Sequence, residues 1–135
     1  MIEIEYILSP HQREAIEPIM ERATPMIPPW VTAISVRYVS DLDAMAKVNS
    51  VPEYRMLHIQ IGDAWFSETP EGKPLCIIHE LSHGYVASMA QAYRTLLLAF
   101  TNDGSPVRQL GEEAIRIAEE ACVSDLSRVF KGLLR

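Results

Sequence analysis

Three residues of this chain combine the side-chain types and the spacing of a metal centre, namely His79, Glu80 and His83 in the segment His-Glu-Leu-Ser-His. On a helix, residues four positions apart lie one turn apart on the same face, so both imidazoles can reach one zinc ion. Glu80 is rotated off that axis and can contact a water on the metal rather than the metal itself. Zinc lowers the pKa of such a water to about 7, and a carboxylate beside it can accept the proton. The pattern therefore predicts a zinc centre with Glu80 as general base.

A zinc centre that keeps one position for water needs a third protein ligand. No histidine follows His83, so a ligand further along the chain has to be an acid or a cysteine. The candidates are Asp103, Glu112, Glu113, Glu119, Glu120, Cys122 and Asp125. The expected helix runs about 17 residues past His83 to a loop at 102–106, and the next helix must return a similar distance to reach the metal. This geometry favours residues 119–124 and disfavours Glu112 and Glu113.

Two neighbouring glutamates, Glu119 and Glu120, remain open as the third ligand. Adjacent residues on a helix diverge by about 100°, so we expect only one of them to face the metal-binding helix and the other to be solvated. Glu119 lies closer to the apolar stripe of its helix, and the spacing therefore favours Glu119. That stripe consists of Ile115, Ala118, Cys122, Leu126, Val129 and Leu133.

A family resemblance bears on this choice. The segment HELSH followed by a glutamate-bearing helix resembles the gluzincin metallopeptidases, and the short chain resembles their minimal members, the minigluzincins. Residues 119–125 (EEACVSD) are similar to the glutamate helix of that family, in which a ligand glutamate is followed by small residues and often by an acid one turn later. Glu120 with Asp125 is the better match, although Asp125 is displaced by one residue. The resemblance therefore implies Glu120 as the third ligand, with Glu119 as the alternative.

The same resemblance implies a zincin-like fold that binds zinc and hydrolyses peptide bonds through a metal-activated water, with Glu80 as the general base. In that family a strand ahead of the active helix borders the cleft and binds extended substrate. His58 lies in such an expected strand, 54–61, and is a candidate for an oxyanion or substrate contact. A lone histidine on a strand is more often structural. The longer motif of the metzincins is absent, because Val86 and Met89 stand where glycine and histidine would be.

Two other interpretations of the motif stay open. The chain could be a degenerate zincin-like domain in which zinc serves structure and the domain acts as a binding or regulatory module. It could also be a structural protein without a metal, in which the motif is incidental. Zinc content separates the last interpretation from the others. The substitution Glu80→Gln separates a peptidase from a module, because only a peptidase loses turnover.

The elements that must position these residues are predicted from the periodicity of apolar side chains. Strands are expected at 2–7, 30–39 and 54–61, with a turn at 41–47. A helix is expected at 10–23, because Ser9 and Gln12 have the spacing of a capping box and Pro10 suits the first helical position. Two long helices, 74–100 and 107–134, should form an αα-hairpin around the loop at 102–106. The prediction is one α+β domain over 1–135, with a small sheet and a short N-terminal helix followed by the hairpin.

The composition limits the partners. The chain has 135 residues, 12 of them basic and 18 acidic, for a net charge of −6. This balance argues against nucleic-acid binding, which needs clustered lysine and arginine. The longest uninterrupted apolar run, Leu96–Phe100, is far shorter than the ~20 residues that span a bilayer. We therefore expect a cytoplasmic protein that binds neither nucleic acid nor membrane, and the family resemblance implies a peptide or protein substrate.

Overall fold

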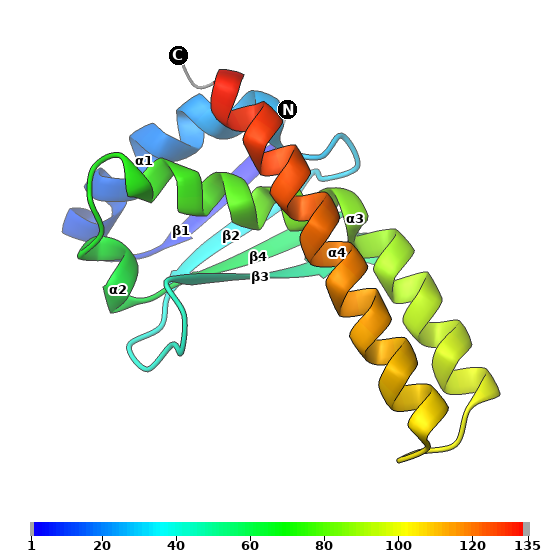
Figure 1. Cartoon of the computed structure of the whole chain (residues 1–135). Coiled ribbons are helices and arrows are strands. Elements are labelled where there is room, and N and C mark those ends of the chain that lie inside the picture. Colours follow the sequence, from blue (N-terminus) through cyan, green and yellow to red (C-terminus); the bar gives the residue numbers. More distant parts are fainter. Residues whose placement is uncertain (1, 134–135) are drawn as a thin grey trace.

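The computed structural model describes residues 2–133, which form one sheet and several helices (Figure 1). The elements are β1 (Glu3–Ile7), α1 (Pro10–Ala23), the 3-10 turn η1 (Thr24–Met26), β2 (Ala33–Tyr38), β3 (Ala46–Val51), the 3-10 turn η2 (Pro52–Tyr54), β4 (Met56–Ile61), α2 (Asp63–Phe66), α3 (Gly72–Phe100) and α4 (Pro106–Leu133). The predicted α+β class, the small sheet and the C-terminal helical hairpin are confirmed. The expected end of the last helix, Leu134, lies outside the described residues.

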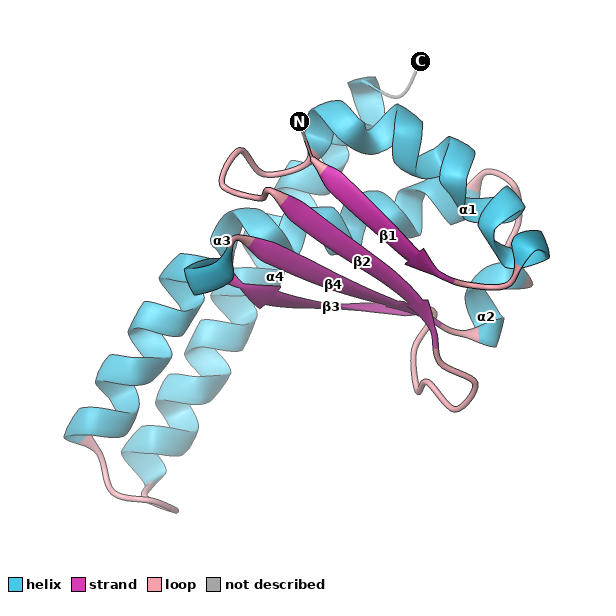
Figure 2. Ribbon diagram, turned by 180° about the vertical axis from the view of Figure 1, so that it is seen from behind, coloured by secondary structure: helices cyan, strands magenta, loops and turns pink. Residues whose placement is uncertain are grey.

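The sheet is mixed, with the strand order β1-β2-β4-β3. β1, β2 and β4 run parallel to one another, and β3 runs antiparallel to β4 at the edge. Helices α1 and α3 lie across one face, and no long helix of the described chain covers the opposite face (Figure 2). β3 corrects the expectation of a turn at 41–47, since Ala46 and Lys47 already belong to this strand. The sequence pattern of β3 is weak, because its large apolar residue Val48 stands between two exposed polar residues, Lys47 and Asn49.

Helix α1 begins as predicted. The hydroxyl oxygen of Ser9 accepts a hydrogen bond from the backbone N–H of Gln12 at 3.2 Å, and the Gln12 side chain accepts one from the backbone N–H of Ser9 at 3.0 Å. Such a cap stabilises a helix by about 1 kcal/mol. It also sets where the helix starts, so that Ile16 and Met20, one turn apart, both face the sheet.

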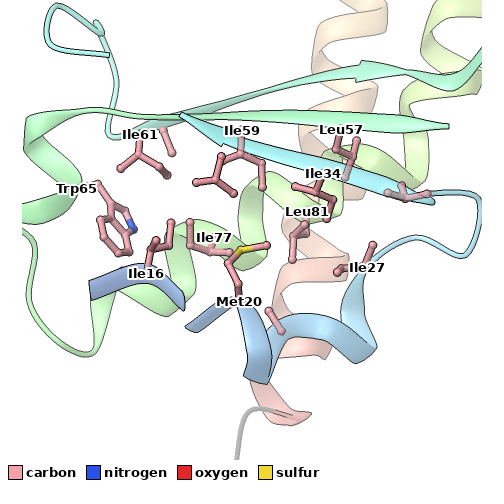
Figure 3. Packing of buried hydrophobic residues seen from close by; sticks show 14 residues of the cluster. Ile16, Met20, Ile27, Ile34, Leu57, Ile59, Ile61, Trp65, Ile77 and Leu81 are labelled. Atoms are coloured by element: carbon pink, nitrogen blue, oxygen red, sulfur yellow. The ribbon is translucent and has the colours of Figure 1, made fainter. Parts of the chain in front are cut away.

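The core fills the space between the sheet and helices α1 and α3 (Figure 3). Alternate residues of β4 point into it, and so do residues four apart on each helix. Its largest side chains are almost completely buried; they include Ile16, Met20, Ile34, Leu57, Ile59, Ile61, Trp65, Ile77 and Leu81. Burial of one such side chain stabilises the fold by about 2 kcal/mol. Because Ile77 and Leu81 face this core, His79 is turned to the other side of α3 and Glu80 to its flank.

The hairpin of α3 and α4 extends beyond the sheet. Buried residues of α3 end at Ala90, and the rest of the helix projects away together with α4 (Figure 1). Arg108 closes the connection by donating hydrogen bonds to the carbonyls of Leu98 at 3.1 Å and Thr101 at 2.6 Å. Gly104 in this loop has a φ of +71°, which favours glycine. Among the described residues, no helix combines the length and the apolar character needed to cross a membrane.

Candidate metal centre

Close packing at Gly84, the residue after the motif, fixes the position of helix α3 under the sheet. The carbonyl of Gly84 accepts a hydrogen bond from the indole N–H of Trp30 at 2.9 Å. A Cβ atom on Gly84 would lie 2.8 Å from a ring carbon of Pro28, so a larger residue would push the helix away. Together with the buried Ile77 and Leu81, this contact fixes both the depth and the rotation of the helix.

Three side chains of the hairpin converge, namely His79 and His83 from α3 and Glu120 from α4. The distance from His83 Nε2 to Glu120 Oε1 is 3.5 Å, and that from His79 Nε2 to Glu120 Oε2 is 3.9 Å. One ligand atom from each residue lies within 4.8 Å of the other two. Within residues 2–133 no other set of histidine, cysteine and acidic side chains comes together in this way. The group could therefore hold a metal ion.

Glu119 also reaches this centre, which corrects the expectation that only one of the two glutamates faces α3. Its Oε2 lies 3.4 Å from His83 Nδ1, and its Oε1 accepts a hydrogen bond from Arg94 at 3.0 Å. Its side chain is 18% exposed, so it is not part of a solvated face. Glu119 and Glu120 both fit because the two nitrogens of one imidazole point in different directions. Glu119 is placed to orient the His83 ring, as the hydrogen-bond partners of metal ligands do.

Partial burial changes the protonation equilibria of Glu80 and His79. Burial, and after it the charge of Glu120, raises the pKa of Glu80 to about 7, while a hydrogen bond from the backbone of Val48 acts in the opposite direction. Burial, and after it the neighbouring His83, lowers the pKa of His79, against a smaller opposing effect of Glu120. The neutral imidazole is the form that binds metals. His79 is thus favoured in its metal-binding form at neutral pH.

The centre opens into a cleft of about 420 Å³ between α3, α4 and the outer edge of β3. The backbone N–H of Gly62 donates to the carbonyl of Met45 at 2.9 Å, which sets the alternation of hydrogen bonding between β3 and β4. In an antiparallel pair, backbone groups point alternately toward and away from the partner strand. Ala46, Val48 and Ser50 therefore direct their N–H and C=O groups toward the cleft. Consistent with this, the carbonyl of Ser50 accepts a hydrogen bond from Gln91 at 3.1 Å.

The structure does not bring His58 to this centre. Leu57 and Ile59 on β4 face the helices, so His58 between them points to the opposite face of the sheet. Its Nδ1 lies 2.6 Å from the hydroxyl oxygen of Ser35 there. The strand that borders the cleft is β3, not the strand 54–61 that the family resemblance suggested.

Gln91 and Arg94 line the cleft although neither was among the candidate residues. Gln91 lies eight positions and Arg94 eleven positions after His83, so the helical period places all three on one face of α3. This spacing is a signal that the sequence offers for finding them.

Comparisons with protein-family models, with curated proteins and with solved structures find no match to this chain.

Proposed function

We propose that this chain is a zinc-dependent peptidase in which His79, His83 and Glu120 hold the metal and Glu80 is the general base. The observation that carries the proposal is the convergence of two imidazoles and a carboxylate within 4.8 Å in the cleft that Glu80 also lines. Nitrogen and carboxylate oxygen are ligands that zinc takes at about 2.0–2.2 Å, and four such ligands in a tetrahedron lie about 3.3 Å apart. The separations of 3.5 and 3.9 Å run to the two different oxygens of Glu120, and one ligand atom from each of the three residues lies within 4.8 Å of the other two.

The residues of the chain then have distinct roles. Bound zinc would supply a Lewis acid that polarises a peptide carbonyl and activates a water. Glu80 accepts the proton of the attacking water and passes it to the amine that leaves. Glu119 holds the ring of His83 through Nδ1, and Arg94 in turn holds Glu119. The imidazole of His83 is thereby kept in one orientation.

The substrate we propose is a peptide segment in extended conformation. The outer edge of β3 directs backbone groups of Ala46, Val48 and Ser50 into the cleft, next to Glu80. An extended peptide can add to such an edge as a further strand, with main-chain hydrogen bonds that replace the contacts of Gln91 with Ser50 and of Glu80 with Val48. A peptide bound along β3 would pass the metal-holding residues at the level of Val48, whose backbone is hydrogen-bonded to Glu80.

The alternative is a degenerate zincin-like domain that binds zinc for structure and acts as a binding or regulatory module. One observation favours it. The metal-holding residues come from both α3 and α4, so an ion bound there would cross-link the two helices of the hairpin. In this case Glu80 would have no chemical role, and its loss would leave the function of the domain unchanged.

Metal analysis and peptide hydrolysis with matched variants test the proposal. The purified chain should contain about one zinc per molecule and cleave an unstructured protein such as casein, and a chelator should abolish the cleavage until zinc is restored. Glu80→Gln should keep its zinc and its fold but lose at least ~10²-fold in rate, the usual effect of removing a general base. Glu112→Gln, an exposed glutamate of α4, is the control and should cleave normally.

Three possible results distinguish the peptidase from the structural module and from a chain without this metal centre. Cleavage by Glu80→Gln at the wild-type rate would refute the catalytic role of Glu80. A chain that binds one zinc with His79 and His83 but cleaves no peptide would favour the structural module. Unchanged zinc content in the His79→Ala variant would refute the proposed metal centre.

A further inference from the structure

We propose that the projecting half of the hairpin binds a second copy of this chain, so that two hairpins form a four-helix bundle. The surface concerned, the arm face, consists of Val86, Met89, Tyr93, Leu96 and Phe100 on α3 and Val107, Leu110, Ala114, Ala118 and Cys122 on α4. It begins beside the last buried turn of α3, at Val86 and Cys122, and continues along the part of the hairpin that extends beyond the sheet (Figure 1). Assembly through the arm face does not depend on the metal or on peptidase activity.

The spacing on α3 is that of a seam between helices. Along the five arm-face residues of α3 the steps are three, four, three and four positions. This repeat keeps apolar side chains on one side of a helix, where they can fit between those of another helix. The contact with α4 inside the chain uses another side of α3, because in the projecting part Arg94 and Leu97 approach α4. The five arm-face residues of α3 are therefore available for contact with a partner.

The arm face is also hollowed between the two helices. An apolar groove of about 320 Å³ is lined by Val86, Met89, Ala90 and Tyr93 on α3 and by Ala114, Ile115, Ala118, Glu119 and Cys122 on α4. Glu119 is the only charged residue of that lining, and it is engaged by His83 and Arg94. Grooves between side-chain rows accept the ridges of another helix. The face continues past the groove, since Phe100 lies seven positions after Tyr93 and Val107 seven before Ala114.

The exposed area of the arm face matches what a stable dimer needs. Its six large exposed side chains, Met89, Tyr93, Leu96, Phe100, Val107 and Leu110, are each between 54% and 84% exposed. With about 200 Å² for a fully exposed aromatic side chain and about 150 Å² for an aliphatic one, they present roughly 650 Å² of mostly apolar surface, within the ~600–1,000 Å² that one partner of a standard interface contributes. This patch also exceeds the few hundred Å² of contiguous apolar surface that monomers usually expose.

A second copy satisfies the requirements for the occupant. The partner must offer an uncharged apolar surface of similar area, with helical ridges that fit the groove. The arm face of another copy has these properties, and a two-fold axis brings the same patch of both chains together. Two antiparallel helix pairs packed in this way form a four-helix bundle. The net charge of −6 per chain does not oppose the contact locally, because the arm-face residues carry no charge.

Sedimentation equilibrium on the full chain, from about 1 μM to several hundred μM, tests the inference. The wild-type chain should be dimeric over the upper part of this range. Leu110→Glu and Phe100→Glu each place a charge in the arm face at an exposed position. Each should raise the dissociation constant of the dimer at least about tenfold. Leu98→Glu is the control, because Leu98 is 52% exposed but points to the opposite side of α3 from Leu96 and Phe100. Circular dichroism of the three variants checks that the helices are intact.

A second measurement uses the thiol of Cys122 in the groove. Its reaction with a thiol reagent should slow as the wild-type concentration rises, and should stay fast in Leu110→Glu. A monomer at every concentration would overturn the inference and assign the arm face to a different partner. A dimer that tolerates both glutamate substitutions in the arm face, or that is weakened equally by Leu98→Glu, would also overturn it.

Discussion

Replacing Glu80 by glutamine should stabilise the metal-free protein near neutral pH, although it removes the proposed general base. The partly buried carboxyl has a pKa raised from 4.5 to about 7, chiefly by burial and then by Glu120. In the unfolded chain the carboxyl ionises near its ordinary value. The folded state therefore carries a penalty that is negligible below pH 4.5, grows as the pH rises to about 7 and is complete above it.

The size of this penalty follows from the pKa. One pKa unit corresponds to about 1.4 kcal/mol, so the rise from 4.5 to about 7 amounts to roughly 3 kcal/mol. Water reaches part of the carboxyl and screens its charge, which reduces the expected effect to about 2 kcal/mol. Glutamine has nearly the same shape as glutamate, and its amide oxygen can still accept a hydrogen bond from the backbone of Val48. The substitution thus removes the charge with little change in packing.

Urea unfolding in the presence of a chelator, at about pH 8 and about pH 4.5, measures the effect. The free energy of unfolding of Glu80→Gln should exceed that of the wild type by about 2 kcal/mol at the higher pH and by less than about 0.5 kcal/mol at the lower. Glu112→Gln is the matched control and should stay within about 0.5 kcal/mol of the wild type at both. A Glu80→Gln protein that is no more stable than the wild type at the higher pH would refute the reasoning, because Glu80 would then be as well solvated when folded as when unfolded.

Alanine at Glu120 should abolish stoichiometric zinc binding in a calorimetric titration, whereas alanine at Glu119 should weaken it about 10- to 100-fold; wild-type affinity in Glu119→Ala would contradict its positioning role. Gly84→Ala should lower the free energy of unfolding by about 1–3 kcal/mol, because the added methyl meets a proline ring carbon. An unchanged thermal midpoint would show that the chain yields there. Burial, aided by Glu80, raises the pKa of the Cys76 thiol to about 12, and Cys122 is exposed. A thiol reagent at neutral pH should therefore label Cys122 first, and mass spectrometry that finds Cys76 labelled first would contradict this.

The helices and the convergence of His79, His83 and Glu120 could be predicted because their signals are local or simply geometric. The positions of His79 and His83 follow from a spacing of four on a helix that packs through its other side. The level of Glu119 and Glu120 follows from equal distances before and after the loop at 102–106. The choice between the two glutamates could not be made in this way. The 100° between neighbouring residues excludes one glutamate only if both must reach the same atom. His83 presents two nitrogens that point in different directions, so each glutamate can reach one of them.

The edge strand β3 could not be predicted, and the assignment of the cleft depended on it. Its stability comes from pairing with β4 and from the packing of α3, which are long-range interactions that a sequence window does not contain. When β3 is not recognised in the sequence, the strand that carries His58 is the one expected to border the cleft. Pairing with β3 makes β4 an interior strand, and the alternation along β4 then turns His58 to the open face of the sheet.

Strand β1 forms the other edge of the sheet, and its acidic residues affect how copies of the chain can meet. The described residues add no strand beyond β1, so one side of its backbone is free to pair. Glu3 and Glu5 on this strand are exposed carboxylates. Two chains joined through β1 would bring these like charges together, which opposes extension of the sheet from one molecule to the next. The acids thereby protect the protein from aggregation through strand addition, and high salt should weaken this protection because it screens the repulsion.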